Sequence, residues 1–322
     1  MRRRDRLLRV VGATVSTAIV TIALAALGAW LVGSIATDRW RWSQFLWWFP
    51  WFGYAFVALP AGVIAWQSRT VWRRRLARLA CVGIVVVVAI GLWRDVGLPR
   101  RAPVAPTLSI VQWNASWVNA KNGARPAQEL HDLDADVLLI SNPFRLFTKD
   151  RTEAWRAAGY DVRQFGTFAV VSRVPILDAR TLFANDRIAA LECTIDATAS
   201  LGQAVTVLLL DLPSNPRVAR MRVIEECLAA LADARAAPAD IVAGDLNITR
   251  GSHSLTVLAP DRRDAWADGG VGWGASWPRP IPFLQLDHVL IAPWLEAHET
   301  RFIDLDAESH LAQRVTLGAK AP

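Results

Sequence analysis

Apolar residues are concentrated in the first third of the chain. Residues 10–36 and 45–66 contain no charged side chain, and both runs are long enough to cross a bilayer as helices. Pro50 and Pro60 lie inside the second run and are expected to kink its helix without preventing a span. A third run, residues 79–93, reaches spanning length only if residues 76–78 join it and Arg78 extends to the interface. The pattern predicts a membrane anchor of three transmembrane helices in residues 1–94.

From residue 108 onward, short apolar runs alternate with polar segments, as is typical of strands. Few helical patterns lie between them, which favours a mixed α/β sandwich over a doubly wound sheet. Residues 95–107 contain three prolines and are expected to form a linker, so that residues 108–322 make up one α/β domain. The expected strands are residues 108–113, 137–140, 168–171, 189–195, 204–210, 241–243, 286–291 and 314–317, and the expected helices are residues 127–133, 151–158 and 218–236.

Arginines are distributed asymmetrically around the apolar runs. The amino-terminal tail carries five and the loop of residues 67–78 carries five, whereas the loop of residues 37–44 carries two. By the positive-inside rule the tail and the second loop are cytoplasmic, and three spans then place the carboxyl-terminal domain outside the cytoplasm. The expected location is the cell membrane, as a multi-pass protein. If the third span does not insert, the domain lies in the cytoplasm instead.

The net charge of +7 is not shared evenly between the two parts. Residues 1–106 hold 15 of the 36 Lys and Arg residues but three of the 29 acidic ones, so the remainder carries 21 basic and 26 acidic residues. A duplex-binding nuclease needs a cationic face, because phosphate contacts supply most of its affinity. The acidic balance of the second part therefore argues against nucleic acid as the main partner.

A carboxylate and a carboxamide stand two residues apart just after the apolar run 241–243. In an extended segment Asp245 and Asn247 share one face, at the carboxyl end of a core strand, where α/β proteins place their chemistry. One group can bind a metal or take a proton, and the other can donate to a phosphate oxygen. Taken alone, Gly-Asp-Leu-Asn also fits a turn that closes a strand.

Further segments accompany Gly-Asp-Leu-Asn at 244–247, and their order resembles the endonuclease/exonuclease/phosphatase superfamily, the DNase I-like fold. The resemblance covers about residues 108–317 and implies a four-layer α/β sandwich. The segments are Ser-Ile-Val-Gln-Trp-Asn at 109–114, an apolar strand running into Ser-Asn at 141–142, Ser-Arg-Val-Pro at 172–175, Ser-Trp-Pro at 276–278 and Leu-Asp-His at 286–288.

The resemblance implies hydrolysis of a phosphate ester with Mg²⁺ or Mn²⁺ as cofactor. Asp245 would activate or position water, Asn114 and Asn247 would contact the phosphate and the groups around the metal, and His310 would contact the phosphate being cleaved. The residues implied in catalysis are Asp245, Asn247, Asn114, His310 and Asp287. The residues implied in substrate binding are His288, Asp211 and Trp277, and those implied in metal binding are Asn142 and Asp287.

Three departures from the family pattern weaken this interpretation. Asn142 stands where the family has its metal-binding glutamate, and a neutral carbonyl attracts Mg²⁺ less than a carboxylate does. Ser309 stands where an aspartate precedes the closing histidine, and Glu308, one position away, would face the opposite side of a strand. Asp211 stands where the family has a histidine, and we expect it to supply a replacement carboxylate.

These departures leave three functions open. The first is a membrane-anchored, metal-dependent phosphoesterase that acts on a small or lipid-linked phosphate. The second is a catalytically inactive relative that binds a phosphorylated ligand or a protein partner, and the third is a nuclease. The expected partners are the lipid bilayer and a phosphate-ester ligand, and nothing in the sequence implies an oligomer.

Overall fold

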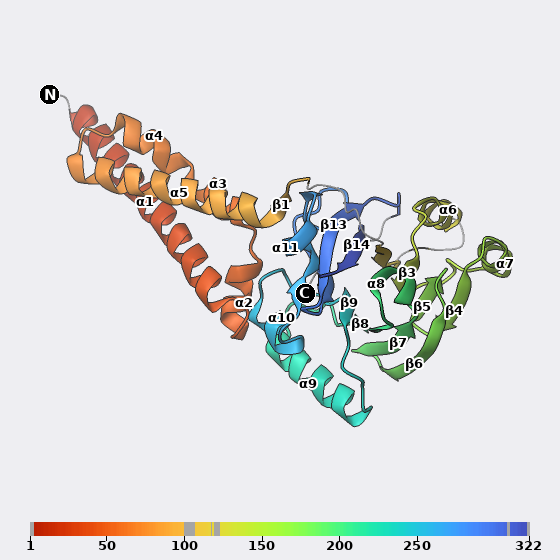
Figure 1. Ribbon diagram of the computed structural model, residues 1–322. Coiled ribbons are helices and arrows are strands. Elements are labelled where there is room, and N and C mark those ends of the chain that lie inside the picture. The colour runs from red at the N-terminus through yellow and green to blue at the C-terminus, as the bar shows by residue number, and fades with distance from the viewer. Residues whose placement is uncertain (1–2, 100–106, 117, 119–122, 308–309, 321–322) are drawn as a thin grey trace. The chain divides into compact units, whose positions relative to one another are not determined.

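The computed structural model describes residues 3–99, 107–116, 118, 123–307 and 310–320 (Figure 1). Its contacts divide the chain into two compact units, Met1–Arg94 and Asp95–Pro322. The first is helical, and the second contains the sheets. Glu308 and Ser309, as well as residues 100–106 of the expected linker, lie outside the described residues.

The helical unit is built on small side chains at its helix contacts. Figure 1 shows α1 running from the amino terminus to α2, with α3 and α4 returning beside it and α5 running back. Ala23, Ala58 and Ala80 are fully buried where these helices meet, because alanine lets two helix backbones approach closely. The helices are α1 (Arg3–Ala36), α2 (Arg41–Trp48), α3 (Trp51–Ala58), α4 (Pro60–Gln67) and α5 (Val71–Asp95).

Two helices are long and apolar enough to cross a membrane, and a bent pair raises the number to at most three. The two are Arg9–Ala36 and Val71–Asp95, so the run of residues 79–93 is part of a full-length helix. The second run, which was expected to form a kinked helix, is broken between α2 and α3, where the axis bends by 74°. Phe49 is extended because the ring of Pro50 disfavours a helical conformation in the residue before it.

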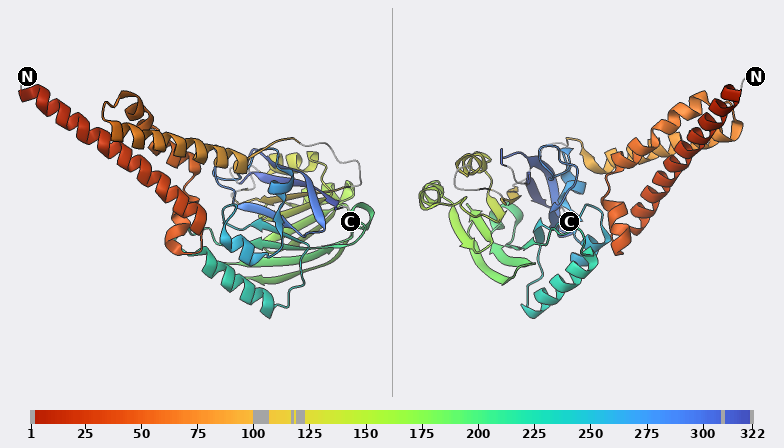
Figure 2. Two further views of the ribbon diagram at one scale, coloured as in Figure 1. Left: turned by 60° about the vertical axis from the view of Figure 1, so that its left-hand side comes forward. Right: turned by 180° about the vertical axis from the view of Figure 1, so that it is seen from behind.

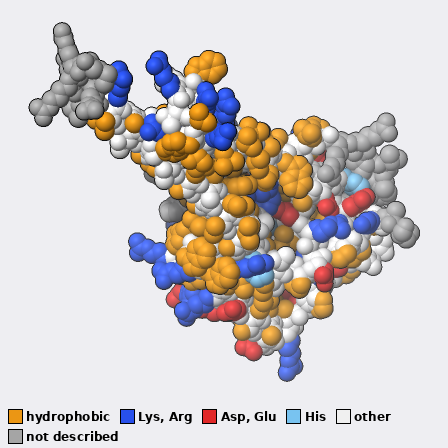
Figure 3. Space-filling view, turned by 90° about the vertical axis from the view of Figure 1, so that its left-hand side faces the viewer, with side chains coloured by type: hydrophobic (Ala, Val, Ile, Leu, Met, Phe, Trp, Pro, Cys, Tyr) orange, Lys and Arg blue, Asp and Glu red, His pale blue; other side chains and the backbone are white. Residues whose placement is uncertain are grey.

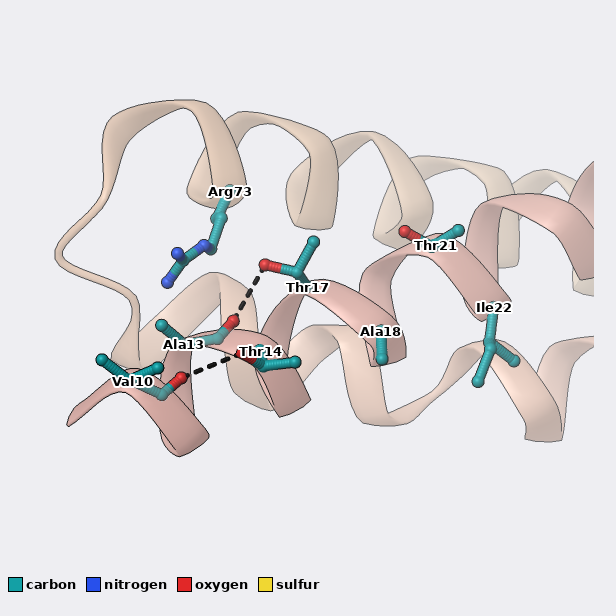
Figure 4. Close-up of a pocket in the computed structure, with 8 residues that line it drawn as sticks. All are labelled: Val10, Ala13, Thr14, Thr17, Ala18, Thr21, Ile22 and Arg73. Atoms are coloured by element: carbon teal, nitrogen blue, oxygen red, sulfur yellow. Dashed lines mark hydrogen bonds between the residues drawn. The ribbon is translucent and has the colours of Figure 1, made fainter. Parts of the chain in front are cut away.

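A groove of about 630 Å³ runs along α1 and ends at Arg73 of α5 (Figure 4). The Thr14 hydroxyl donates to the Val10 carbonyl at 3.1 Å, and the Thr17 hydroxyl donates to the Ala13 carbonyl at 2.8 Å. The threonines therefore satisfy their polar groups on their own helix. Figure 3 shows a group of Lys and Arg side chains toward the amino-terminal end of this unit and many hydrophobic side chains farther along it.

Two six-stranded sheets form the second unit, and they contain all eight expected strands. Both sheets are mixed, with one parallel pair each, β2 with β3 and β8 with β9. The first sheet has the order β13 (Leu295–Ile303), β14 (Ala312–Ala319), β2 (Leu108–Asn114), β3 (Val137–Ser141), β5 (Phe168–Ser172) and β4 (Asp161–Phe165). The second has the order β10 (Arg263–Asp264), β12 (Asp287–Ile291), β9 (Ile241–Asp245), β8 (Val205–Asp211), β7 (Ala189–Ile195) and β6 (Ile176–Ala184).

The sheets and helices stack in four layers, which confirms the predicted four-layer α/β sandwich. The inner faces of both sheets share one core, exemplified by Leu139 and Leu209. On the outer faces, Trp155 packs against the first sheet and Ile224 against the second. The helices of these outer layers lie on opposite sides of the strands in Figure 2. They are α6 (Ala124–Asp132) and α7 (Lys149–Ala157) on one side, and α9 (Arg220–Asp233) and α10 (His253–Leu258) on the other.

A two-stranded pairing joins the start of this unit to a later loop. β1 (Val96–Gly97) pairs with β11 (Gly272–Trp273) in antiparallel register, beside α11 (Ala265–Gly269). The first residues of the expected linker are therefore part of the sheet-containing unit. The short helix α8 (Thr198–Leu201) completes the elements.

Candidate active site

Three aspartates form a row across three neighbouring strands. Asp211 on β8 is in register with Asp245 on β9, and Asp245 is in register with Asp287 on β12. Side chains of residues in register point to the same face of a sheet. The sheet therefore gathers three carboxylates that are separated in sequence by more than thirty residues each.

Gly244 allows the close strand contact beneath this row. Its φ is +134°, a conformation that side-chain-bearing residues rarely adopt. A Cβ at this position would lie 1.9 Å from the carbonyl oxygen of Leu210 on β8. Glycine is thus required for Asp245 to stand beside Asp211.

Two asparagines from the other sheet close the site. The Asn114 side-chain amide, at the end of β2, donates to Asp245 Oδ2 at 2.8 Å. Asn142, which follows β3 with a φ of +54°, donates from Nδ2 to Asn114 Oδ1 at 3.1 Å and to Asp211 Oδ2 at 2.9 Å. One amide nitrogen therefore bridges the two sheets.

His310 lies among these carboxylates. Its Nδ1 is 2.7 Å from Asp287 Oδ2, and its Nε2 is 3.8 Å from Asp245 Oδ2. The backbone is held by Trp113, whose indole nitrogen donates to the His310 carbonyl at 2.9 Å. Burial lowers the pKa of the imidazole, but the charges of Asp287 and Asp245 outweigh this and raise the pKa of His310 to about 9.

The carboxylates carry more buried negative charge than one imidazolium neutralises. Burial, followed by the charge of Asp287, raises the pKa of Asp245 to about 7. Burial also raises the pKa of Asp211, although the hydrogen bond from Asn142 opposes this. Such crowding is relieved when a cation or a proton is taken up.

The donor set fits a divalent cation. Asp245, Asp287 and His310 offer ligand atoms that all lie within 4.8 Å of one another. Carboxylate and amide oxygens are the ligands that Mg²⁺ and Mn²⁺ prefer. Beside them, Gln112 donates to Asp287 Oδ1 at 3.4 Å, while its buried Oε1 and both polar atoms of the Gln313 side chain have no hydrogen-bond partner in the described part of the chain.

Six of the residues singled out in the sequence meet at this site. Two that were expected there, Asn247 and His288, are directed elsewhere. Asn247 does not share a face with Asp245, because β9 ends at Asp245 and Asn247 has a φ of +50°. Its Nδ2 donates to the Leu212 carbonyl at 2.8 Å instead. The residues that meet are Asn114, Asn142, Asp211, Asp245, Asp287 and His310.

The structure does not place His288 where a substrate can touch it. His288 follows Asp287 directly, so its side chain points to the opposite face of the strand and is fully buried. Its Nε2 is 2.7 Å from the Ile248 carbonyl, and its Nδ1 is 3.8 Å from Asp264. Trp277, by contrast, is partly exposed in a loop next to the site.

Sequence reasoning missed Gln112 and Gln313, which are paired in register on β2 and β14 and fully buried. A signal was present, because Gln112 precedes Asn114 by two residues and therefore shares its face. It also missed Arg220, whose buried guanidinium donates to the carbonyls of Pro213, Asn215 and Asn247. These bonds hold the loops after β8 and β9.

Comparison with known proteins places this arrangement in a family. The profile of the Endonuclease/Exonuclease/phosphatase family matches residues 111–307. No curated protein matches the chain. Among solved structures, an endonuclease/exonuclease/phosphatase from Beutenbergia cavernae DSM 12333 is similar with a TM-score of 0.50 and 18% identity, over 67% of this chain and 72% of that one.

A functionally unknown conserved protein from Enterococcus faecalis V583 has a TM-score of 0.50 and 13% identity, over 66% of this chain and 100% of that one. Humanized TDP2 from D. rerio has a TM-score of 0.49 and 18% identity, over 66% of this chain and 98% of that one. At these identities the solved structures concern the fold alone. The family profile, however, spans more than half of the chain, and the chain therefore belongs to the endonuclease/exonuclease/phosphatase family.

Proposed function

We propose that this protein is a membrane-anchored, divalent-metal-dependent phosphoesterase that acts on a small or lipid-linked phosphate. The observation that carries the proposal is the row of Asp211, Asp245 and Asp287, closed by His310 and by two asparagines. Such a set of buried carboxylates with one imidazole is costly to fold unless it binds a cation and an anionic ligand. A functional requirement therefore explains why these charged side chains are buried together, whereas a contribution to the stability of the fold does not.

Asp245 is the group suited to take a proton from water. Its Oδ1 accepts from the Asn247 amide at 3.0 Å and its Oδ2 from Asn114 at 2.8 Å, so both oxygens are fixed in direction. A pKa of about 7 matches the pH at which a general base works best. Asn114 thus orients the base from the opposite sheet.

His310 is the group suited to bind the phosphate. A pKa of about 9 keeps its ring protonated at neutral pH, and Asp287 holds Nδ1 while Nε2 is directed toward Asp245. A fixed imidazolium stabilises the negative charge that develops on phosphoryl oxygens. A metal ion supplies further neutralisation of those oxygens when it is bound.

The carboxylates of Asp287 and Asp211 would hold that ion, together with oxygens of the nearby asparagines. The family pattern has a metal-binding carboxylate at position 142, where this chain has asparagine. Asn142 donates its amide nitrogen to Asp211, and we propose that the Asp211 carboxylate takes over the metal-binding role. The net charge of the second unit disfavours the nuclease alternative. We further propose that the anchor lies in the cell membrane with this unit outside the cytoplasm, as the arginine distribution indicates.

One observation favours a second candidate, an inactive relative that binds a phosphorylated ligand. Asn142 donates to both Asn114 and Asp211, so its amide group stabilises the cluster without a cation. An experiment has to separate the two functions.

The test is hydrolysis of bis-p-nitrophenyl phosphate and p-nitrophenyl phosphate by the full chain in detergent, with Mg²⁺ or Mn²⁺ and with EDTA. The proposal predicts turnover that needs the metal and is lost in Asp245→Asn. Asp240→Asn is the matched control, because Asp240 immediately precedes the opposite end of β9 and binds Thr206 and Trp294 instead. Absence of turnover in the wild type, with turnover appearing in Asn142→Glu, would favour the inactive relative.

A further inference from the structure

Exposed hydrophobic side chains are unevenly distributed over the described part of the second unit. Seven large hydrophobic residues are exposed there, and five of them belong to just two segments. Isolated exposed hydrophobics are ordinary, whereas a group of them marks an interaction surface. The five are Val96, Leu98, Trp273, Trp277 and Ile281, and the other two are Phe144 and Leu177.

Backbone pairing brings the two segments together. Val96 is in register with Trp273, and the Gly274 amide donates to the Asp95 carbonyl at 2.8 Å. The Asp95 carboxylate in turn lies 3.2 Å from the Arg250 guanidinium. Residues 95–98 therefore lie beside a loop, residues 272–284, which we call the rim loop.

Chain continuity limits where residues 95–98 can lie if α5 crosses a membrane. Asp95 is the last residue of α5, whose uncharged stretch ends at Trp93. A helix that spans the bilayer places the residues just after its apolar stretch in the headgroup layer. If α5 spans the bilayer, residues 95–97 lie in that layer, and the rim loop is hydrogen-bonded to them. Tryptophan is enriched at this depth, because its ring has an apolar body and a polar N–H.

The rim loop also borders the candidate active site. The Ser276 hydroxyl accepts from the Asp287 amide at 3.4 Å, and the Ser276 carbonyl accepts from the Leu311 amide at 3.0 Å. Ser276 thus contacts the backbone of Asp287 and of the residue after His310. The next residue, Trp277, is 41% exposed.

Several polar groups of the loop form hydrogen bonds within the loop. The Trp273 indole nitrogen donates to the Pro282 carbonyl at 2.7 Å, and the Phe283 and Leu284 amides donate to the Trp277 carbonyl at 2.9 and 2.8 Å. Ile281, which is 77% exposed, lies in sequence between Trp277 and Pro282, whose carbonyls accept these hydrogen bonds. Internal hydrogen bonds of this kind lower the cost of placing the apolar side chains of the loop in the headgroup layer.

We infer that the rim loop rests in the headgroup layer of the membrane that holds α5, and that the candidate site takes a phosphate ester carried by a lipid. The second part rests on the phosphoesterase function proposed above. A lipid would present its phosphate at the depth where the loop meets Asp287 and His310. Its apolar chain would remain in the bilayer beside Trp277 and Ile281.

Membrane contact is tested by a fluorescent label on the full chain in nanodiscs. Ile281→Cys is labelled with an environment-sensitive dye, and quenching by spin-labelled phospholipid is measured. Leu177→Cys is the matched control, because Leu177 is also an exposed aliphatic residue but lies on β6, the edge strand farthest from β12 in its sheet. Cys81→Ala is the background. The two other cysteines are buried, and burial raises the pKa of both thiols to about 12, which keeps them unreactive.

We expect strong loss of fluorescence at position 281 and none at position 177. Equal quenching at both positions, or none at either, would overturn the contact. This measurement does not depend on catalysis, so it decides the placement of the loop even if the protein proves inactive.

The substrate class is tested with two esters that share a leaving group. Hexadecyl p-nitrophenyl phosphate enters the nanodisc, and methyl p-nitrophenyl phosphate stays in water. We expect a preference for the hexadecyl ester, which Ile281→Asp reduces roughly tenfold, the scale of withdrawing one isoleucine from an apolar environment. Turnover of the methyl ester should not change.

Three outcomes would count against the lipid substrate. Equal loss for both esters would make the loop part of the catalytic architecture rather than a membrane contact. Equal turnover of both esters by the wild type would refute a lipid preference. Hydrolysis of neither ester would refute the proposed function and the lipid substrate together, and the quenching result would still stand.

Discussion

Replacing Asp245 with asparagine is expected to abolish hydrolysis and, at the same time, to stabilise the metal-free protein above pH 7. The Asp245 side chain is 4% exposed, and burial beside Asp287 raises its pKa from the ordinary 3.8 to about 7. A carboxyl whose pKa is raised by folding favours the native state below pH 3.8, and this contribution is lost as pH rises through 7. At pH 8 the ionised group therefore opposes folding.

The size of the effect follows from the two pKa values. A rise from 3.8 to about 7 corresponds to about 4 kcal/mol at pH 8, because one unit equals 1.36 kcal/mol. Two donors bind the Asp245 carboxylate, the Asn114 side-chain amide and the Asn247 backbone N–H. Asparagine can accept from only one of them and turns its NH₂ group toward the other, so one hydrogen bond is lost at a cost of about 1–2 kcal/mol. The net gain of about 2 kcal/mol corresponds to a rise in Tm of roughly 4–8 °C for a unit of this size.

The assay is thermal unfolding of the full chain in detergent with EDTA, at pH 5 and pH 8. We expect a gain at pH 8 and none at pH 5, where Asp245 is already protonated in the native state. Asp264→Asn is the contrasting control, because burial opposes ionisation of Asp264 but His288 and Arg250 outweigh it and lower its pKa. That variant should lose about 3 kcal/mol or more at pH 8. A lower Tm for Asp245→Asn at pH 8 would refute the reasoning.

Three further predictions concern the backbone, the metal position and the histidine. Gly244→Ala should cost more than about 3 kcal/mol, because a Cβ would collide with a β8 carbonyl at 1.9 Å, whereas Gly202→Ala, at φ +82° in open space, should cost about 1 kcal/mol; similar losses in chemical denaturation would contradict this. Asn142→Glu should lower the Mn²⁺ concentration that gives half-maximal turnover at least about tenfold, because a carboxylate replaces an amide, and an unchanged Mn²⁺ titration would argue against a cation at this position. Asp287→Asn should lower the pKa of His310 from about 9 toward 6.5 or below, which NMR titration of the metal-free protein would detect; a value that stays near 9 would mean that another group holds the proton.

The main elements of the fold were predictable because the strands that form the core are apolar on both faces. The strand of residues 241–245, for example, is buried at every position. β6 and β13 were not predicted, because they are edge strands with exposed polar positions and lack that signal. The break at Pro50 was expected only as a kink, since the sequence does not show whether neighbouring helices support a continuous span.

The candidate site was predictable as a set of residues but not as a geometry. Strand order brings Asp211, Asp245 and Asp287 into register, and no local pattern encodes strand order. His288 could have been excluded from the sequence, because it is adjacent to Asp287 on one strand and must face the other way. The direction of Asn247 could not, since it depends on where β9 ends.

The most direct test of the account is a titration of the full chain with Mn²⁺ in which bound metal and the initial rate of phosphate-ester hydrolysis are measured in the same samples. The account predicts that the rate rises in proportion to bound Mn²⁺ and saturates with it. Asp245→Asn should remain folded, as its raised Tm would show, and yield no turnover at any concentration. Hydrolysis that persists in EDTA, or Mn²⁺ that binds at Asp287 and Asp211 without producing turnover, would contradict the account.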